Sequence, residues 1–392
     1  MKKHPQNEEA KNIYQDPPSE QLQSIINLYT QGQMQKALSE SSQMLEQFPN
    51  SVVLYNISGV SNAGLMQFDA AIDSYKQALK IKPDYAEAYY NLSLLYLLRG
   101  NLDEGFKCYE WRLKIKERLA APARTNLIWD GEQSLSGKHF VVYEEQGLGD
   151  IIQFCRYLPV LEQKGANVTF KVKSNLHALL QTMDSKTSLN TRLPEENKID
   201  FELPLMSLPL ALKTTVETIP AQIPYLYADD QRKKRWNEKL GNKTVTRIGL
   251  VWSGSTLHKN DHNRSLLLNQ LTSLLVLPVE FHSLQKEVRE IDIKTLTDFP
   301  KINQHQDDLL DFSDTAALID EMDLVISVDT VVAHLSGAMG KKTFILLPYS
   351  PDYRWMLDRA DSPWYPTATL FRQPSVGDWD SVISEIRQLL SD

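Results

Sequence analysis

The sequence predicts an all-α repeat array followed by an α/β region of two lobes, each built on a parallel sheet. Three observations lead to this fold class. Small residues and prolines recur with a period of 34 in the first third of the 392-residue chain. From about Leu135, short β-prone runs alternate with amphipathic helical stretches, which is typical of parallel sheets. A proline-containing segment and a charged helical stretch at residues 219–240 separate two such regions and read as a linker.

The repeat array is predicted from self-similarity at a fixed spacing. Ala37, Ala71 and Gly105 are 34 residues apart in each case (71 − 37 = 34 and 105 − 71 = 34). Pro49 and Pro83 share this spacing. Small residues at such positions let two antiparallel helices touch, and the prolines close each helix pair.

This combination resembles the tetratricopeptide repeat, in about three units over residues 18–118. The third unit departs from the pattern, because Glu117 stands in place of the closing proline and Arg112 in place of the usual small residue. We therefore expect an atypical last repeat that docks onto the next domain, as terminal repeats often do. The concave surface of such a stack typically binds a peptide or protein. The repeats alternatively cap and brace the next domain, or make a homodimer, and the sequence leaves these interpretations open.

The domain boundaries are predicted from the changes in pattern along the chain. We expect, in chain order, a disordered N-terminus (1–17), the tetratricopeptide repeats (18–118), an N-terminal α/β lobe (126–230) and a C-terminal α/β lobe (245–392). Within the lobes, the clearest strand patterns are at 139–143, 167–172, 247–252, 279–284, 323–328 and 343–347.

Composition excludes several classes of protein. The net charge of −8 gives no electrostatic reason to expect nucleic acid, which needs a basic patch. Cys108 and Cys155 are far apart, so they suit a reducing compartment and form neither a disulfide framework nor a zinc site. The first residues lack the apolar core of a signal peptide. No stretch approaches the roughly 18 apolar residues of a membrane span. We therefore expect a cytoplasmic protein without a transmembrane segment.

The first lobe carries its candidate catalytic residue in the turn after its first strand. The stretch Glu-Glu-Gln-Gly-Leu-Gly-Asp at 144–150 follows an apolar, β-prone run and precedes an amphipathic one. Asp150 is therefore predicted at or near a helix N-cap, at the carboxyl edge of a sheet, where open α/β folds bind ligands. Glu145, Gln146 and Gly149 either line an acceptor pocket or hold the turn.

The second lobe has polar residues after its first strand. Ser253, Gly254 and Ser255 can wrap a phosphate with backbone N–H groups. Lys259 and Arg264 supply cations in the same loop, which would balance the charge on a diphosphate leaving group when no metal is held. The alternative interpretation is a solvated polar loop.

Further candidates follow other strands of this lobe. Thr330 and the N–H groups after it are predicted to form a helix N-terminus, which attracts phosphate. Asp329 either caps that helix or meets a ribose or sugar hydroxyl, and His334 lies one turn further on. The alternative is a pair of ordinary caps, worth about 1 kcal/mol, and a packed core histidine. Gln285 either contacts a base or ribose edge or is an ordinary polar residue at a strand end.

Two remaining patterns affect the predicted site. His258 and His262 are four apart but lack the HExxH pattern, so we expect no metal site and no cofactor. Residues 348–366 form a loop rich in Trp and Tyr. This loop either stacks on a base or sugar or packs against the other lobe.

Together, four stretches resemble the heptosyltransferase-type family, glycosyltransferase family 9, and in particular its bacterial branch with N-terminal tetratricopeptide repeats. They are EEQGLGD (144–150), GLVWSGS (249–255), DLVISVDTVVAHLSGAMGKKTFILLPY (323–349) and DYRWMLDRADSPWYPTATLFRQ (352–373). The likeness covers about residues 130–390. It implies a GT-B fold of two Rossmann-like lobes and an inverting, metal-independent enzyme with its donor nucleotide in the C-terminal lobe.

The resemblance also implies roles for particular residues. The catalytic aspartate of the family follows a glycine in the turn after the first strand, which corresponds to Asp150. Its donor-diphosphate motif corresponds to Asp329 and Thr330, with His334 near by. Its basic residue after the first strand of the second lobe corresponds to Lys259 or Arg264, and the loop around Lys259 differs from that of simple heptosyltransferases.

The predicted chemistry is transfer of a sugar from a nucleotide-sugar to a hydroxyl, with a protein held by the repeats as one acceptor. An inverting transfer needs one base, and desolvation can raise the pKa of an aspartate from about 3.9 towards neutrality. The alternative is an interaction protein in which repeats bind a partner and the lobes are catalytically idle. An epimerase or hydrolase on the same fold is a third, less favoured hypothesis.

Overall fold

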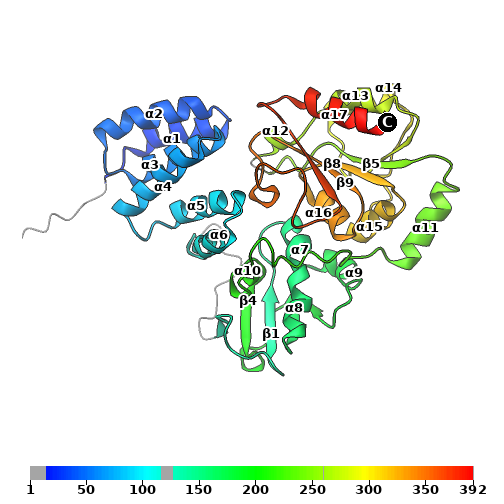
Figure 1. Cartoon of the computed structure of the whole chain (residues 1–392), viewed down its shortest axis with the longest axis horizontal. Helices are drawn as coiled ribbons and strands as arrows, with labels where there is room; N and C mark the ends of the chain where they lie inside the picture. Colours follow the sequence, from blue (N-terminus) through cyan, green and yellow to red (C-terminus); the bar gives the residue numbers. More distant parts are fainter. Residues whose placement is uncertain (1–14, 116–126, 259, 392) are drawn as a thin grey trace, which may run out of the picture. The chain divides into compact units, whose positions relative to one another are not determined.

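The computed structural model describes residues 15–115, 127–258 and 260–391. It divides into two compact units, Met1–Leu97 with Lys107–Leu119, and Leu98–Phe106 with Ala120–Asp392. Figure 1 labels many of the helices and strands of each unit. No helix in the described ranges is both long enough and apolar enough to cross a membrane.

The helical repeats consist of successive helices of similar length. In chain order they are α1 (Ser19–Thr30), α2 (Met34–Gln47), α3 (Val52–Gly64), α4 (Phe68–Ile81), α5 (Ala86–Leu98) and α6 (Leu102–Tyr109), followed by the 3₁₀ turn η1 (Glu110–Lys114). The small residues of the 34-residue period lie in the interior, since Ala37 and Ala71 are fully buried. A Cβ on Gly59 would lie 2.3 Å from the Tyr75 ring, so only glycine allows this contact between α3 and α4.

The last repeat is built around a buried arginine. Arg112 is 1% exposed, and its guanidinium lies 4.8 Å from the centre of the Tyr109 ring. Its Nη1 pairs with Glu110 at 2.6 Å. The residue that breaks the repeat pattern is therefore part of the interior of this unit. Glu117 lies outside the described residues.

The N-terminal lobe of the α/β unit has a parallel sheet in the order β3-β2-β1-β4. Its strands are β1 (His139–Tyr143), β2 (Asn167–Lys171), β3 (Ser188–Asn190) and β4 (Phe201–Pro204), and its helices are α7 (Leu148–Phe154), α8 (Leu158–Gln163), α9 (His177–Leu180) and α10 (Leu208–Ala211). The strand order reverses between β1 and β4.

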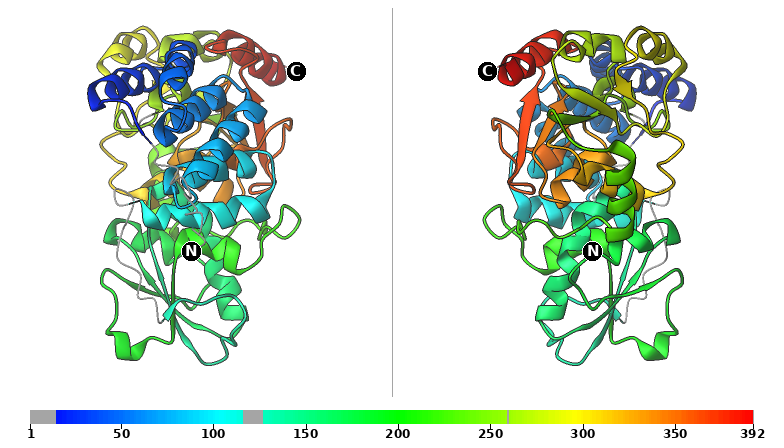
Figure 2. Two further views of the ribbon diagram at one scale, coloured as in Figure 1. Left: turned by 90° about the vertical axis from the view of Figure 1, so that its left-hand side faces the viewer. Right: turned by 90° about the vertical axis from the view of Figure 1, so that its right-hand side faces the viewer.

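The C-terminal lobe has a parallel sheet in the order β10-β9-β8-β5-β6-β7. Its strands are β5 (Arg247–Val251), β6 (Glu280–Ser283), β7 (Ile302–Asn303), β8 (Leu324–Val328), β9 (Thr343–Leu347) and β10 (Ala368–Arg372). Its helices are α12 (Asp261–Arg264), α13 (Thr272–Leu275), α14 (Glu290–Asp298), α15 (Phe312–Asp320), α16 (Val331–Ala338) and α17 (Trp379–Ser391). Figure 2 shows the two sheets from both sides.

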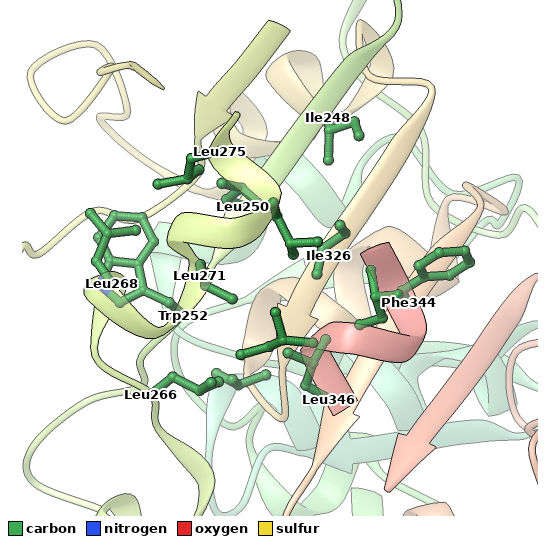
Figure 3. Packing of buried hydrophobic residues seen from close by; sticks show 14 of the residues in the cluster. Ile248, Leu250, Trp252, Leu266, Leu268, Leu271, Leu275, Ile326, Phe344 and Leu346 are labelled. Carbon is green, nitrogen blue, oxygen red and sulfur yellow. The ribbon is translucent and has the colours of Figure 1, made fainter. Parts of the chain in front are cut away.

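The core of the C-terminal lobe explains why its central strands read as continuous apolar runs. Every residue of β5, β8 and β9 is buried, as expected for parallel strands covered on both faces. Ile248, Leu250, Ile326, Phe344 and Leu346 pack together on the face covered by α13 and α17 (Figure 3). This core fixes the carboxyl ends of the central strands.

The predicted linker helix is α11 (Asp230–Leu240), and its many cations contact acidic residues of the C-terminal lobe. Arg232 pairs with Asp311 at 2.6 Å and with Asp314 at 2.8 Å. Asp314 is fully buried and also pairs with Arg235. The charged residues of α11 therefore form a face of this helix that packs against the C-terminal lobe. The predicted fold class, helical repeats followed by two α/β lobes with parallel sheets, is confirmed.

Candidate functional site

The predicted site residues gather where both sheets reverse their strand order. Asp150 follows β1, at the β1/β4 reversal of the first lobe. In the second lobe, β5 has β8 and β6 as neighbours, and the loops after β5 and β8 carry Ser253–Ser255 and Asp329–Thr330. Ligands of open α/β sheets bind at such switch points.

Asp150 lies in the first turn of α7 and joins the two lobes. Its Oδ2 accepts a hydrogen bond from the main-chain N–H of Gly147 at 2.9 Å. Its Oδ1 pairs with Nη2 of Arg354, which belongs to the 3₁₀ turn η9 (Tyr353–Trp355) of the C-terminal lobe. The side chains of Asp150 and Arg354 are 13% and 11% exposed, so the ion pair is largely shielded from water.

Burial is the main influence on the protonation of Asp150. It raises the pKa of this carboxyl, while the Arg354 guanidinium and the Gly147 N–H oppose the rise, and the Asp352 carboxylate adds to it. The net direction is upward. A carboxylate whose pKa is raised is a better proton acceptor at neutral pH than an exposed one.

The neighbours of Asp150 in the turn have separate structural tasks. Glu145 is buried, and its Oε1 accepts from the Met206 N–H at 3.0 Å, which ties the end of β1 to the segment after β4. Gln146 is exposed and adopts a positive φ of 64°, which reverses the chain before α7. A Cβ on Gly149 would lie 3.0 Å from Cδ2 of His334, so this glycine lets α7 lie close to α16.

The loop after β5 is stabilised by its own side chains. The Ser253 N–H donates to Oε1 of Gln285 at 3.3 Å, and Nε2 of Gln285 donates to the Ser253 carbonyl at 2.9 Å. The Gly254 N–H donates to Oγ of Ser265 at 3.0 Å. Two of the three N–H groups predicted to wrap a phosphate therefore have protein partners. Ser253 Oγ is buried and has no hydrogen-bond partner among the described residues.

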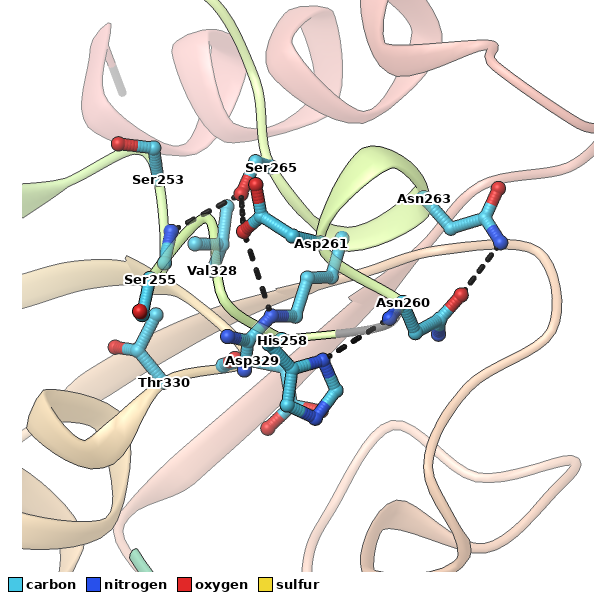
Figure 4. A network of polar contacts seen from close by, with 12 residues as sticks. Ser253, Ser255, His258, Asn260, Asp261, Asn263, Ser265, Val328, Asp329 and Thr330 are labelled. Carbon is cyan, nitrogen blue, oxygen red and sulfur yellow. Dashed lines mark hydrogen bonds and ion pairs between the residues drawn. The ribbon is translucent and has the colours of Figure 1, made fainter. Parts of the chain in front are cut away.

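Arg264 connects this loop to the loop after β8. Figure 4 labels Ser253 and Ser255 of the first loop and Asp329 and Thr330 of the second. Its Nη1 donates to the Asp329 carbonyl at 2.8 Å. A Cβ on Gly254 would lie 2.4 Å from its Nη2, so the guanidinium lies directly against the Gly254 backbone. The structure thus places one predicted cation between the two loops. Lys259, the other, lies outside the described residues.

Asp329 and Thr330 begin α16 without a side-chain cap. Thr330 is the N-cap residue, but its hydroxyl lies 3.2 Å from Ser327 Oγ and does not accept from the helix N–H groups. Burial and the Asp352 carboxylate raise the pKa of Asp329 to about 6, against the opposing effects of Trp355, Arg264 and Arg354. A carboxyl that is readily protonated is compatible with a neighbouring phosphate, because its protonated form has no negative charge to repel the phosphate.

His334 is a packed histidine at the contact between the lobes. Its Nδ1 lies 3.0 Å from the Tyr365 hydroxyl, and its ring stacks on Trp355 with centres 5.1 Å apart. Burial, with the nearby guanidinium of Arg354, holds its pKa well below the usual range, so the ring is neutral. These contacts agree with the alternative interpretation of His334 as a packed core histidine, and its ring lies against Gly149, the residue before Asp150.

The aromatic loop packs against the N-terminal lobe. The Trp364 ring lies 5.4 Å from the Phe154 ring of α7. Arg156, which is 3% exposed, donates to the Trp364 carbonyl at 2.7 Å and to the Tyr225 hydroxyl at 2.8 Å. This guanidinium links the first lobe, the linker and the aromatic loop, and so fixes where η9 meets Asp150.

Sequence reasoning missed Arg354 and Asp352. Oδ1 of Asp352 accepts from the Arg354 N–H at 3.0 Å and from Nη1 of Arg354 at 2.7 Å. The sequence did contain a signal for these two residues, because they are charged residues in a loop of buried aromatic residues, and such charges need polar partners.

Metal ligands do not cluster in the described part of the chain, where no group of three or more His, Cys, Asp or Glu side chains could hold an ion.

Comparison with known proteins identifies the repeats and shows what the α/β unit is similar to. A family model described as TPR repeat matches residues 67–103, which confirms tetratricopeptide repeats in this chain. The α/β unit is similar to solved structures of glycosyltransferases, and they include the heptosyltransferase group that the sequence motifs resemble.

Three particular proteins illustrate these similarities. Protein FlbA of Caulobacter vibrioides is 24% identical over a match 411 residues long, counted with its gaps. The match covers 88% of this chain and 68% of FlbA. The structure of E. coli ADP-heptose LPS heptosyltransferase II is 12% identical, with a TM-score of 0.44, and covers 64% of this chain and 98% of its own. A glycosyltransferase of family 9 from Veillonella parvula is 10% identical, with a TM-score of 0.45, and covers 66% and 96%.

Proposed function

We propose that the α/β unit is an inverting glycosyltransferase in which Asp150 is the catalytic base. The observation that carries this proposal is the position of its carboxylate. It lies at the carboxyl edge of β1, shielded from water, and contacts the lobe whose helix α16 begins beside two guanidinium groups. Such a carboxylate can accept a proton from a hydroxyl held between the lobes.

The reaction proceeds in one displacement. The acceptor oxygen attacks the anomeric carbon of the donor sugar as the bond from that carbon to the diphosphate oxygen breaks. The leaving nucleoside diphosphate keeps the electron pair of the broken bond, and the acceptor proton passes to Asp150. Attack from the face opposite the leaving group inverts the anomeric centre.

The residues of the second lobe would stabilise the leaving group. The N–H groups at the start of α16 receive no side-chain cap, so they would bind an anion at that helix end, and the helix dipole would add to the attraction. Arg264 is held beside them by the Asp329 carbonyl. These fixed charges supply compensation in place of a metal, which is why we propose a metal-independent transfer.

The helical repeats provide a surface for the acceptor. Because the chain contains tetratricopeptide repeats, we propose that a protein or peptide bound to them carries the accepting hydroxyl. The competing function is an interaction protein whose lobes bind no donor. Calorimetry with ADP, GDP and UDP separates the two, since the interaction protein would bind none of these nucleotides.

The substitution D150N tests the role of the base. It keeps the size and most of the hydrogen bonding of the side chain but removes the proton acceptor. We expect release of nucleoside diphosphate from the donor to fall by at least about 100-fold, with nucleotide binding retained. Asp184 is an exposed carboxylate of the same lobe, and D184N is the matched control, expected to be as active as the wild type. Wild-type turnover by D150N would exclude Asp150 as the base.

A further inference from the structure

Arg354 holds the proposed base through an ion pair that opposes proton transfer to it. One oxygen of Asp150 accepts the Gly147 N–H and the other pairs with the guanidinium. Burial leaves the pKa of this carboxyl raised, but the guanidinium opposes that rise, because a cation in contact with a carboxylate stabilises its ionised form and weakens its affinity for a proton. Transfer requires that affinity, because the acceptor proton must end on Asp150. Loss of the ion pair would therefore make Asp150 a stronger base.

The guanidinium has little room and two acidic neighbours. Nη1 of Arg354 pairs with Asp352 at 2.7 Å, and its guanidinium carbon lies 4.3 Å from the centre of the Tyr353 ring. Asp352 precedes Arg354 by two residues and belongs to the same loop, whereas Asp150 belongs to the other lobe. If the loop moves, Arg354 and Asp352 move together and keep their contact. A competing anion would therefore replace the pair between Arg354 and Asp150.

A competing anion would bind within reach of Arg354. Arg354 lies near the start of α16, because Trp355, the next residue of η9, stacks on His334 in the first turn of this helix with ring centres 5.1 Å apart. Arg264 lies at the same place, because its Nη1 donates to the carbonyl of Asp329, two residues before this helix, at 2.8 Å. A diphosphate at the start of α16 would therefore lie close to both guanidinium groups. Guanidinium binds phosphate oxygens through two parallel hydrogen bonds, as it does carboxylates.

We infer that Arg354 binds Asp150 in the unloaded protein and exchanges it for the diphosphate of the donor, so that donor binding frees the base. This inference rests on the proposed function. In the loaded protein, Arg354 would stabilise the charge that develops on the leaving nucleoside diphosphate. Asp150, relieved of its cation, would gain affinity for the acceptor proton only when a donor is in place. The same residue thus couples the two halves of the site.

The exchange predicts opposite effects for the two partners on nucleotide affinity. Binding of a diphosphate must break the Asp150–Arg354 pair, so D150N, which removes the competing carboxylate, should tighten binding of a nucleoside diphosphate by about fivefold. R354Q removes a phosphate ligand and should weaken it by about tenfold. In the double variant, the tightening by D150N should disappear, because Arg354 is no longer there to be released.

Calorimetric titration of the full chain with ADP, GDP and UDP measures these affinities. R354K, which keeps the charge but loses the fork, should recover part of the affinity. Arg359 pairs with Asp361 in the same loop, so R359Q is the matched control, expected to bind like the wild type. Thermal unfolding of each variant identifies any that fails to fold, and D150S then replaces D150N.

The possible outcomes separate this inference from the proposed function. Binding to the wild type with unchanged or weaker affinity in D150N overturns the exchange and leaves the proposed function standing. Unchanged affinity in R354Q does the same. If none of the three nucleotides binds the wild type, the proposed function fails and the exchange fails with it.

Discussion

Gly149 and His334 meet where α7 of the first lobe packs against α16 of the second, and a Cβ on this glycine would come within 3.0 Å of the imidazole. Contacts this short are rare for real side chains, and His334 is itself fixed between Tyr365 and Trp355. Because Gly149 has no side chain, α7 and α16 can pack closely. This close packing determines how near Asp150 lies to η9.

The substitution G149V should destabilise the protein by about 1–3 kcal/mol, because the added methyl groups must displace a packed ring. Donor turnover should fall with it, since the lobes would separate beside the base. Urea unfolding and release of nucleoside diphosphate are the two measurements. A valine variant with wild-type stability and turnover would show that the helices do not need this close approach.

Asp329 should make stability depend on pH. Its pKa is raised to about 6 in the folded protein from 3.8, so between these values the unfolded chain gives up its proton first. Below about pH 4 the carboxyl is protonated in both the folded and the unfolded state and does not change the free energy of unfolding. Above pH 6 it is ionised in both states, and its burial lowers the free energy of unfolding. D329N should therefore be more stable than the wild type at pH 7.5, by up to about 3 kcal/mol, and should lose this advantage near pH 4.

Asp323 provides a control of opposite sign. Lys243 and the Arg247 N–H lower its pKa, so its ionised form stabilises the folded state, and this contribution is lost as the pH falls through the folded pKa. D323N should be less stable than the wild type at pH 7.5, and the difference should shrink in acid. Urea unfolding at both pH values tests the pair. A D329N difference that is equal at both pH values would contradict the assignment.

Gln285 should stabilise the loop after β5 and should not determine which nucleotide base the protein prefers. Both ends of its amide contact the Ser253 backbone, so Q285A leaves a buried N–H and a carbonyl without partners. The expected loss of stability is about 1–3 kcal/mol. Affinities for ADP, GDP and UDP should fall together and keep their order. A change in that order would instead show that Gln285 contacts the base.

Arg156 should be more important for stability than an exposed arginine. R156M leaves the Trp364 carbonyl and the Tyr225 hydroxyl without their donor, which should cost about 2–3 kcal/mol. Arg192 is exposed, and R192M should change the stability by less than about 0.5 kcal/mol. Denaturant midpoints of the two variants give the comparison. Equal midpoints would show that Arg156 does not hold the lobes.

Much of the fold could be predicted because it is encoded locally. The strand, turn and helix around Asp150 follow from an apolar run, two glycines and an amphipathic stretch that are adjacent in sequence. The run at 323–347 likewise became β8, α16 and β9. Short strands escaped prediction, because β3 and β7 have only 3 and 2 residues and too few side chains to show a period.

The site was less predictable, because its contacts depend on packing between distant segments. Asp150 and Arg354 are 204 residues apart, and nothing in either segment specifies the other. Gln285 and Ser253 meet only because β6 lies beside β5. A sequence pattern indicates which residues reach a sheet edge. It does not indicate which of their hydrogen-bonding groups the protein itself will occupy.

The reversal of strand order in both sheets has a consequence for how such a chain can diversify. The carboxylate is positioned by β1 and α7, while the proposed leaving-group contacts are positioned by β5, β8 and α16, which are encoded more than 90 residues later. Mutations in the loops of one lobe can therefore alter which acceptor is admitted without disturbing the groups that hold the nucleotide. Acceptor preference and donor preference are separately evolvable traits in this architecture.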